Sequence, residues 1–304
     1  MRVAVIGLGS MGEGAALNLA RRGLAVTGAE PREAARAALA AAGGEAVARA
    51  ASLPGGLDAL VLFVVNAGQA EAVLDEALDR VAPGGVVVNC VTVAPDAASC
   101  LAGRVEAAGR LYLDAPVSGG RAASMAGTMT VMAAGSPAAF ERAAPVLDAM
   151  AGKVWRLGDQ PGAGSTVKMV NQLLAGVHIA AAAEAVALGI RAGADPQALF
   201  DVITSSAGNS WMFENRVPHI LAGDDTPLSA VGIFVKDLGI VLDAARSLAF
   251  PLPMAAIAHQ LFLAAAAAGG GGRDDAFVIR VWERLAGIAL PQRGDQGGNP
   301  EENP

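Results

Sequence analysis

The stretch VAVIGLGSMGEGAALNLA, residues 3–20, decides the fold. Residues 3–8 are apolar enough for a buried strand, and a segment with helical periodicity begins directly after Gly12. Between strand and helix, a first glycine makes a tight turn, a second lets the backbone approach a pyrophosphate, and a third permits close helix packing. The stretch therefore predicts a dinucleotide-binding turn, made of Gly7, Leu8, Gly9, Ser10, Met11 and Gly12.

A second strand, LAVTGAE, ends in Glu30, at the place where an acidic residue bonds the ribose hydroxyls of a dinucleotide. A carboxylate there would repel a 2′-phosphate, so Glu30 favours NAD over NADP. Arg32 leaves the alternative open, because an arginine near this position can hold that phosphate.

The rest of the chain divides into two patterns. Apolar strands alternate with helical segments up to about residue 162, and this alternation predicts an α/β fold with a doubly wound parallel sheet of the Rossmann type. Further strands are expected at 59–65, 84–90, 111–117 and 129–135. Beyond Gly164 the pattern is helical. We expect a dinucleotide-binding domain (1–162), one long interdomain helix (163–193), an all-helical domain (194–290) and a disordered tail rich in Gly and Pro (291–304).

Composition excludes several classes of partner. The net charge is −7 and no run of Lys or Arg could neutralise phosphates, so nucleic acid is not expected. Mean hydropathy is +0.44, but the longest apolar runs are mostly alanine and contain His178 and Glu184, so no membrane span is expected. Two cysteines form no disulfide framework, and the N-terminus does not read as a signal peptide. A cytoplasmic protein follows as the expectation.

Only three of the 22 Lys and Arg residues are lysine, and one of them, Lys168, lies in the small, apolar segment GAGSTVKMVNQ (162–172). On a helix, Lys168, Asn171 and Gln172 share one face. A partly desolvated lysine can give up its proton, whereas an arginine stays charged. The group would suit an amine that moves a hydroxyl proton beside an amide that holds the oxygen. The alternative is an ordinary solvated lysine.

A third motif, DAPVSGG (114–120), ends a strand in Ser118, Gly119 and Gly120. Backbone N–H groups without intervening side chains can form an anion-binding concavity. Taken alone, the motif favours an ordinary glycine turn. The three histidines have no metal-ligand spacing, so no metal is expected.

Four motifs in order resemble those of the β-hydroxyacid dehydrogenases, which include 3-hydroxyisobutyrate and tartronate semialdehyde enzymes. They are GLGSMG, DAPVSGG followed by Gly127 and Thr128, GSTVKMVNQ and VKDLGIVL, and the resemblance covers residues 2–290. Residues 206–221 and 226–242 look most like the branch that oxidises L-threonate, a four-carbon sugar acid, with NAD.

The resemblance implies roles for individual residues. Lys168 takes the place of the catalytic lysine, and Asn171 that of the amide that assists it. Ser118, Gly119 and Gly120 would hold the substrate carboxylate. Gln172 replaces a second Asn common in the family and is assigned to the substrate. Ser124 replaces a small apolar residue and is expected to be neutral. The cofactor contacts beyond the glycine turn and Glu30 would be Asn66, Thr92 and Lys236.

The implied function is NAD-dependent oxidation of a short hydroxyacid, either L-threonate or a similar sugar acid, or a compound like 3-hydroxyisobutyrate. Two alternatives are an imine or semialdehyde reductase of the same architecture and a non-catalytic dinucleotide-binding protein. Imine reductases and non-catalytic relatives would be expected to lack Lys168. The wide apolar faces of the expected helices predict a homodimer or homotetramer.

Overall fold

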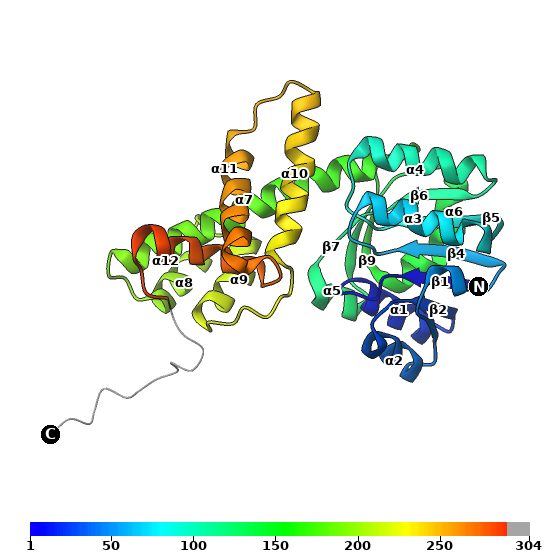
Figure 1. Cartoon of the computed structure of the whole chain (residues 1–304), viewed down its shortest axis with the longest axis horizontal. Helices are drawn as coiled ribbons and strands as arrows, with labels where there is room; N and C mark the ends of the chain where they lie inside the picture. Colours follow the sequence, from blue (N-terminus) through cyan, green and yellow to red (C-terminus); the bar gives the residue numbers. More distant parts are fainter. Residues whose placement is uncertain (291–304) are drawn as a thin grey trace. The chain divides into compact units, whose positions relative to one another are not determined.

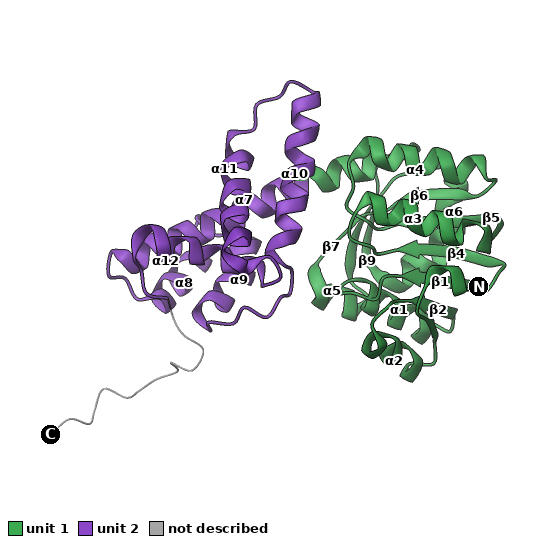
Figure 2. Cartoon of the chain, viewed as in Figure 1, with its two compact units in different colours: residues 1–170 green, residues 171–304 purple. Residues whose placement is uncertain are grey.

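The computed structural model describes residues 1–290 (Figure 1). The chain divides into two compact units, Met1–Val170 and Asn171–Pro304 (Figure 2). The domain boundaries expected at 162 and 193 stay predictions. The tail expected to be disordered, 291–304, lies outside the described residues.

The first unit is built on a six-stranded parallel sheet with the order β3-β2-β1-β4-β5-β6. The order reverses between β1 and β4, which is the switch point where open α/β sheets bind ligands. The predicted doubly wound parallel sheet is confirmed. Its strands are β1 (Arg2–Ile6), β2 (Ala25–Ala29), β3 (Glu45–Val47), β4 (Leu57–Leu62), β5 (Val81–Asn89) and β6 (Leu111–Asp114).

Both faces of this sheet are buried, which explains why its strands read as unbroken apolar runs. Along β1, Val3 and Val5 belong to one hydrophobic core, while Ala4 and Ile6 belong to the other. Helices α1, α2 and α6 contribute to the first core, and α3 and α4 to the second. The helices are α1 (Gly12–Arg21), α2 (Glu33–Ala41), α3 (Ala67–Ala77), α4 (Pro95–Ala107), α5 (Gly120–Ala126) and α6 (Pro137–Met150), with 3₁₀ turns η1 (Ala50–Ser52) and η2 (Leu78–Arg80).

The strand expected at 129–135 does not join the parallel sheet. It forms β8 (Met129–Ala133) in a second sheet, antiparallel to β7 (Val117–Ser118) and parallel to β9 (Ala151–Arg156). The strand expected at 111–117 is divided, because β6 ends at Asp114 and the chain then turns into β7. Strands β3 and β9 were not predicted. Neither contains a fully buried residue, so neither has the apolar run by which the other strands were recognised.

The predicted long helix is confirmed as α7 (Ala163–Arg191), which is 29 residues long. By length and composition, α7 and the segment Pro253–Gly270 could cross a membrane, with mean hydropathies of 1.9 and 1.2. Helices packed inside folded cores pass the same test, so two such segments are weak evidence for a membrane span.

The second unit is helical. Within residues 171–290 the only strand-like pairing is a single bridge between Ala230 and Asp274. The rings of Phe234 and Phe262 stack with their centroids 5.2 Å apart and join α10 to α11. Besides the rest of α7, the unit contains α8 (Pro196–Thr204), α9 (Trp211–Leu221), α10 (Val231–Ser247), α11 (Pro253–Ala265), α12 (Arg280–Ala286), the π-turn η3 (Ala266–Gly270) and the 3₁₀ turn η4 (Asp275–Ile279).

A buried ion pair links α9 to η4. The guanidinium of Arg216 donates to both oxygens of Asp275, with Nη2 3.1 Å from Oδ2, and both residues are buried. Burial raises the pKa of Asp275 to about 6, although Arg216 lowers it. The carboxylate therefore depends on its partner.

We expect Arg216→Ala to lower the free energy of unfolding by about 3–5 kcal/mol, because it leaves a buried charge without its partner. Urea unfolding followed by circular dichroism measures the loss. The deficit should shrink as the pH falls below neutral, because a pKa raised in the folded state favours folding at lower pH. Arg246→Ala, which removes the exposed pair with Asp243, is the control and should leave the unfolding midpoint unchanged. Equal losses in the two variants would contradict the importance of the buried pair.

Candidate active site

The glycine turn between β1 and α1 contains two kinds of glycine. Gly7 has a φ of +85°, and a Cβ on Gly12 would lie 1.8 Å from the carbonyl oxygen of Gly7. The fold itself therefore requires both. Gly9 is different, because a Cβ built there would meet no atom within 4 Å. Its backbone faces open space, as expected where a pyrophosphate approaches the turn, and the turn thus fits a dinucleotide.

Glu30 follows β2 and is only 6% exposed. Its carboxylate accepts hydrogen bonds from the N–H of Leu8 at 3.0 Å and from Nε of Arg32 at 2.7 Å. Burial raises the pKa of Glu30, but the hydrogen bonds from Arg32 and Leu8 outweigh it and hold the pKa below its usual range. Arg32 also donates to the carbonyl of Leu8 at 3.0 Å, so its guanidinium is bound beside the carboxylate.

Two further residues assigned to the cofactor follow strands of the same sheet. Asn66 comes after β4 and caps α3, accepting from the N–H of Gln69 at 2.9 Å. Thr92 comes after β5. The glycine turn, Glu30, Asn66 and Thr92 thus all lie at the carboxyl edge of the sheet, where such folds bind ligands.

The segment Ser118–Gly119–Gly120 connects β7 to α5. Gly119 and Gly120 have φ values of +128° and +68°, which side chains rarely tolerate. A Cβ on Gly119 would also lie 2.5 Å from that of Ala123, whereas one on Gly120 would meet nothing within 4 Å. The backbone geometry explains both glycines, and the open side at Gly120 leaves room for an anion.

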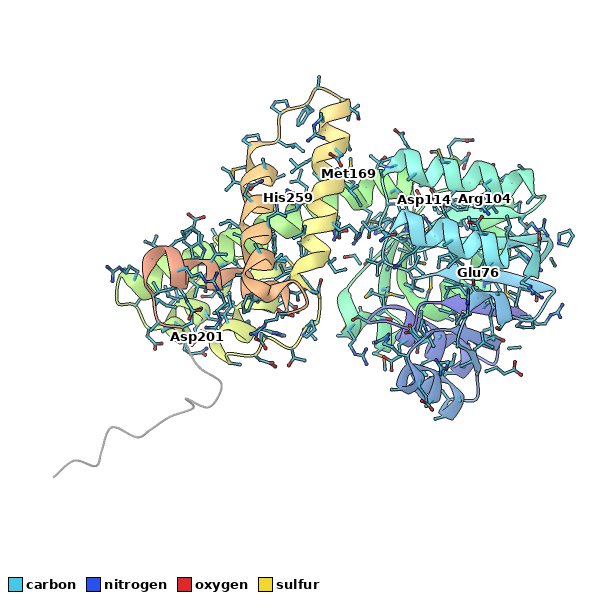
Figure 3. All side chains as sticks on the ribbon, in the orientation of Figure 1. Glu76, Arg104, Asp114, Met169, Asp201 and His259 are labelled. Atoms are coloured by element: carbon cyan, nitrogen blue, oxygen red, sulfur yellow. The ribbon has the colours of Figure 1, made fainter. Side chains whose placement is uncertain are left out.

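Asp114 fixes the start of α7. The residue is fully buried at the end of β6, and its carboxylate accepts from the N–H of Gly162 at 2.9 Å, the N–H of Ser165 at 2.8 Å and Oγ of Ser165 at 2.7 Å. Burial raises its pKa against these hydrogen bonds. Figure 3 labels Asp114 within the first unit. The sequence assigned it no role, although a carboxylate closing an apolar strand was a signal.

Lys168 stands one turn beyond Ser165 on α7 and precedes Met169 in the sequence, the residue that Figure 3 labels on this helix. It is 7% exposed. An ordinary solvated lysine is therefore wrong for this position. Gly164 permits the first turn to pack closely, because a Cβ there would lie 2.3 Å from the carbonyl oxygen of Met132.

The second unit places three predicted residues in one hydrogen-bonded chain. Nδ2 of Asn171 donates to Oε1 of Gln172 at 3.0 Å, and Nε2 of Gln172 donates to Asp237. Nζ of Lys236 donates to the other oxygen of Asp237, which is 2% exposed. The sequence did not single out Asp237. Its position beside Lys236 in an apolar helix was the available signal.

No group of three or more His, Cys, Asp or Glu residues within residues 1–290 could hold a metal ion. The first unit instead offers a turn open to a pyrophosphate and a buried amine on a helix that is anchored at its first turn. These features are typical of nicotinamide-dependent oxidoreductases.

Comparison with known proteins identifies the family within that class. The family described as the NAD binding domain of 6-phosphogluconate dehydrogenase matches residues 2–158, and the NAD-binding family of NADP-dependent 3-hydroxyisobutyrate dehydrogenase matches residues 162–282. An L-threonate dehydrogenase of Cupriavidus necator is 54% identical over 96% of this chain and 99% of its own. One of Escherichia coli K12 is 51% identical over 95% and 96%.

A crystal structure of 3-hydroxyisobutyrate dehydrogenase from Salmonella typhimurium is also similar. It is 51% identical, covers 92% of this chain and 99% of its own, and superimposes with a TM-score of 0.89. The chain belongs to the β-hydroxyacid dehydrogenase family and is an NAD-dependent oxidoreductase of hydroxyacids, as its motifs predicted.

The two kinds of glycine make a matched test of the turn. Gly9→Ala should leave the melting temperature unchanged, because the added methyl group meets open space, but should weaken NAD binding at least about tenfold, or about 1.4 kcal/mol. Gly12→Ala should instead destabilise the fold by about 1–3 kcal/mol or more through overpacking. Differential scanning fluorimetry and calorimetric titration with NAD measure the two effects. Unchanged NAD affinity in Gly9→Ala would show that the open space is not the pyrophosphate site.

Proposed function

We propose that the chain oxidises L-threonate, or a closely similar short sugar acid, with NAD as the oxidant. The observation that carries the proposal is the buried Lys168, placed one turn beyond the helix start that Asp114 anchors. The named activity of the two L-threonate dehydrogenases supports the choice of substrate. The name of the Salmonella structure makes 3-hydroxyisobutyrate the second candidate.

In the proposed mechanism, the backbone N–H groups of Ser118, Gly119 and Gly120 bind the substrate carboxylate. The amine of Lys168 takes the proton from the substrate hydroxyl, and the amide of Asn171, one turn along the same helix, orients the oxygen. NAD held at the glycine turn would supply the acceptor for the hydride of the carbinol carbon. General acid–base help of this kind contributes about 10²–10⁴-fold to the rate. Gln172 would contact the substrate and Lys236 the cofactor, with Asp237 holding both side chains.

The alternatives differ in their need for a proton-transferring amine. A reductase acting on C=N or a non-catalytic binding protein gives no reason to bury a lysine at position 168. A semialdehyde reductase is the same chemistry in reverse and would retain Lys168. The direction of the reaction therefore needs a direct measurement.

A panel of acids tests the function. L-threonate, D-threonate, 3-hydroxyisobutyrate and L-serine should each be assayed with NAD and with NADP by absorbance of the reduced cofactor. We expect the highest kcat/KM for L-threonate with NAD, at least about tenfold above NADP, which needs only about 1.4 kcal/mol of discrimination by Glu30. No turnover of any acid would refute the function, and equal use of both cofactors would show that Arg32 holds the 2′-phosphate.

Lys168→Arg should keep the charge and fold yet lose about 10²–10⁴-fold in kcat, because the guanidinium does not give up its proton near neutral pH. Lys168→Ala should fall as far, and Asn171→Ala less, since the amide moves no proton. Lys153→Arg, at an exposed lysine of the same unit, is the matched control and should keep full activity. If Lys168→Arg retained more than about a tenth of the wild-type kcat, Lys168 would be an electrostatic clamp rather than a proton carrier.

We also propose that the protein is a cytoplasmic homodimer or homotetramer. Several large apolar side chains of the second unit are more than 60% exposed, namely Leu188, Leu248, Phe250, Met254 and Ile257. Light scattering at micromolar concentration should give a mass of two or four chains. Phe250→Asp should shift the mass downward if this surface is the interface. A monomeric wild-type mass would contradict the proposal.

A further inference from the structure

Two helices of the first unit, α1 and α5, connect the glycine turn to the proposed substrate loop, Ser118–Gly119–Gly120. Helix α1 begins at the end of the glycine turn, and α5 begins at the end of Ser118–Gly119–Gly120. A Cβ added to Gly14 of α1 would lie 2.5 Å from Oγ of Ser124 on α5. The two helices are therefore in direct contact, and no side chain separates their backbones at this point.

Ser124 makes the central polar contact between these helices. It is fully buried, and its hydroxyl donates a hydrogen bond to the carbonyl oxygen of Met11, which lies within the glycine turn. The same carbonyl also accepts from the N–H of Ala15 at 3.3 Å, as the first helical turn of α1. Ser124 thus supplies a second donor to a peptide group whose orientation shapes the end of the cofactor turn.

Two more contacts fix α5 against α1. Nδ2 of Asn18 donates to the carbonyl oxygens of Ser124 and Met125 at 2.8 and 3.3 Å. Nη1 of Arg121 pairs with Glu13 at 2.8 Å. Helix α5 has seven residues and is held at three points, so a shift of α5 would break its contacts with α1 and with the end of the glycine turn.

We propose that Ser124 is a positioning residue that couples the two binding loops, so that a hydroxyacid on Ser118–Gly119–Gly120 strengthens dinucleotide binding at the glycine turn. The inference rests on the proposed function, because it takes these glycines as the carboxylate site. By linkage, the dinucleotide strengthens hydroxyacid binding by the same factor. A residue expected to be neutral thereby acquires a role in the order and affinity of binding.

The test uses NADH with L-threonate, a pair that cannot react because both partners are reduced. NADH fluorescence gives the Kd of the wild type with and without saturating L-threonate, and we expect L-threonate to lower it about fivefold. Ser124→Ala should raise the Kd of NADH alone at least about threefold, as for a lost hydrogen bond. It should also bring the ratio of the two Kd values close to one. Arg121→Ala, at a partly exposed pair, should also raise the Kd of NADH alone and bring the ratio of the two Kd values toward one, but by less than Ser124→Ala.

Ser136→Ala is the matched control for a purely structural effect. Ser136 caps α6 in the same unit, accepting from the N–H of Ala139 at 3.2 Å, so its loss should lower the melting temperature but leave both Kd values unchanged. If Ser124→Ala behaved like Ser136→Ala, the coupling role would be refuted. A wild type that turns over L-threonate but shows no coupling would refute it too.

The failure of the proposed function would look different. If no hydroxyacid of the panel were turned over and none changed the Kd of NADH, the substrate assignment would fail. Ser124 would then be judged on the affinity for NADH alone. A raised Kd in Ser124→Ala but not in Ser136→Ala supports its hold on the turn, and an unchanged Kd excludes it.

Discussion

A buried carboxylate, Asp114, is the constraint on which the proposed active site of the first unit depends. It closes the last strand of the parallel sheet and accepts three hydrogen bonds from Gly162 and Ser165. An unpaired acceptor in such a place would cost about 1–3 kcal/mol, more for a charged group, so the strand end and the helix start are fixed together. The backbone of Lys168 is placed with them, because it lies one turn beyond Ser165 on the same helix.

Much of the fold could be predicted because its signals are local. The turn at Gly7–Gly12, the buried strands and the long helix each have a pattern that one stretch of chain contains. The second sheet could not be predicted, because β8 pairs with β7 and β9 through contacts that no local pattern specifies. The same holds for Ser124, whose partner Met11 lies 113 residues away, and for the contact of Asp237 with Gln172, 65 residues away.

Glu30 and Arg32 form an ion pair at the position proposed to select the cofactor. The carboxylate of Glu30 holds the guanidinium of Arg32 at 2.7 Å, and in the proposed site its negative charge would disfavour a 2′-phosphate. A neutral residue at position 30 would remove the repulsion and release an arginine, which is the residue of choice for phosphate recognition. If Glu30 binds the ribose as proposed, the side chain at position 30 decides between NAD and NADP.

The three glycines of the turn have a consequence for interpreting other sequences. Gly7 and Gly12 are demanded by the chain's own atoms, whereas Gly9 has no internal neighbour that forbids a side chain. Relatives that no longer bind the cofactor but keep the fold could replace Gly9 without a steric clash, and could not replace Gly7 or Gly12 in the same way. A relative that differs only in having another residue in place of Gly9 would therefore be expected to keep the fold and to have lost dinucleotide binding at the proposed site.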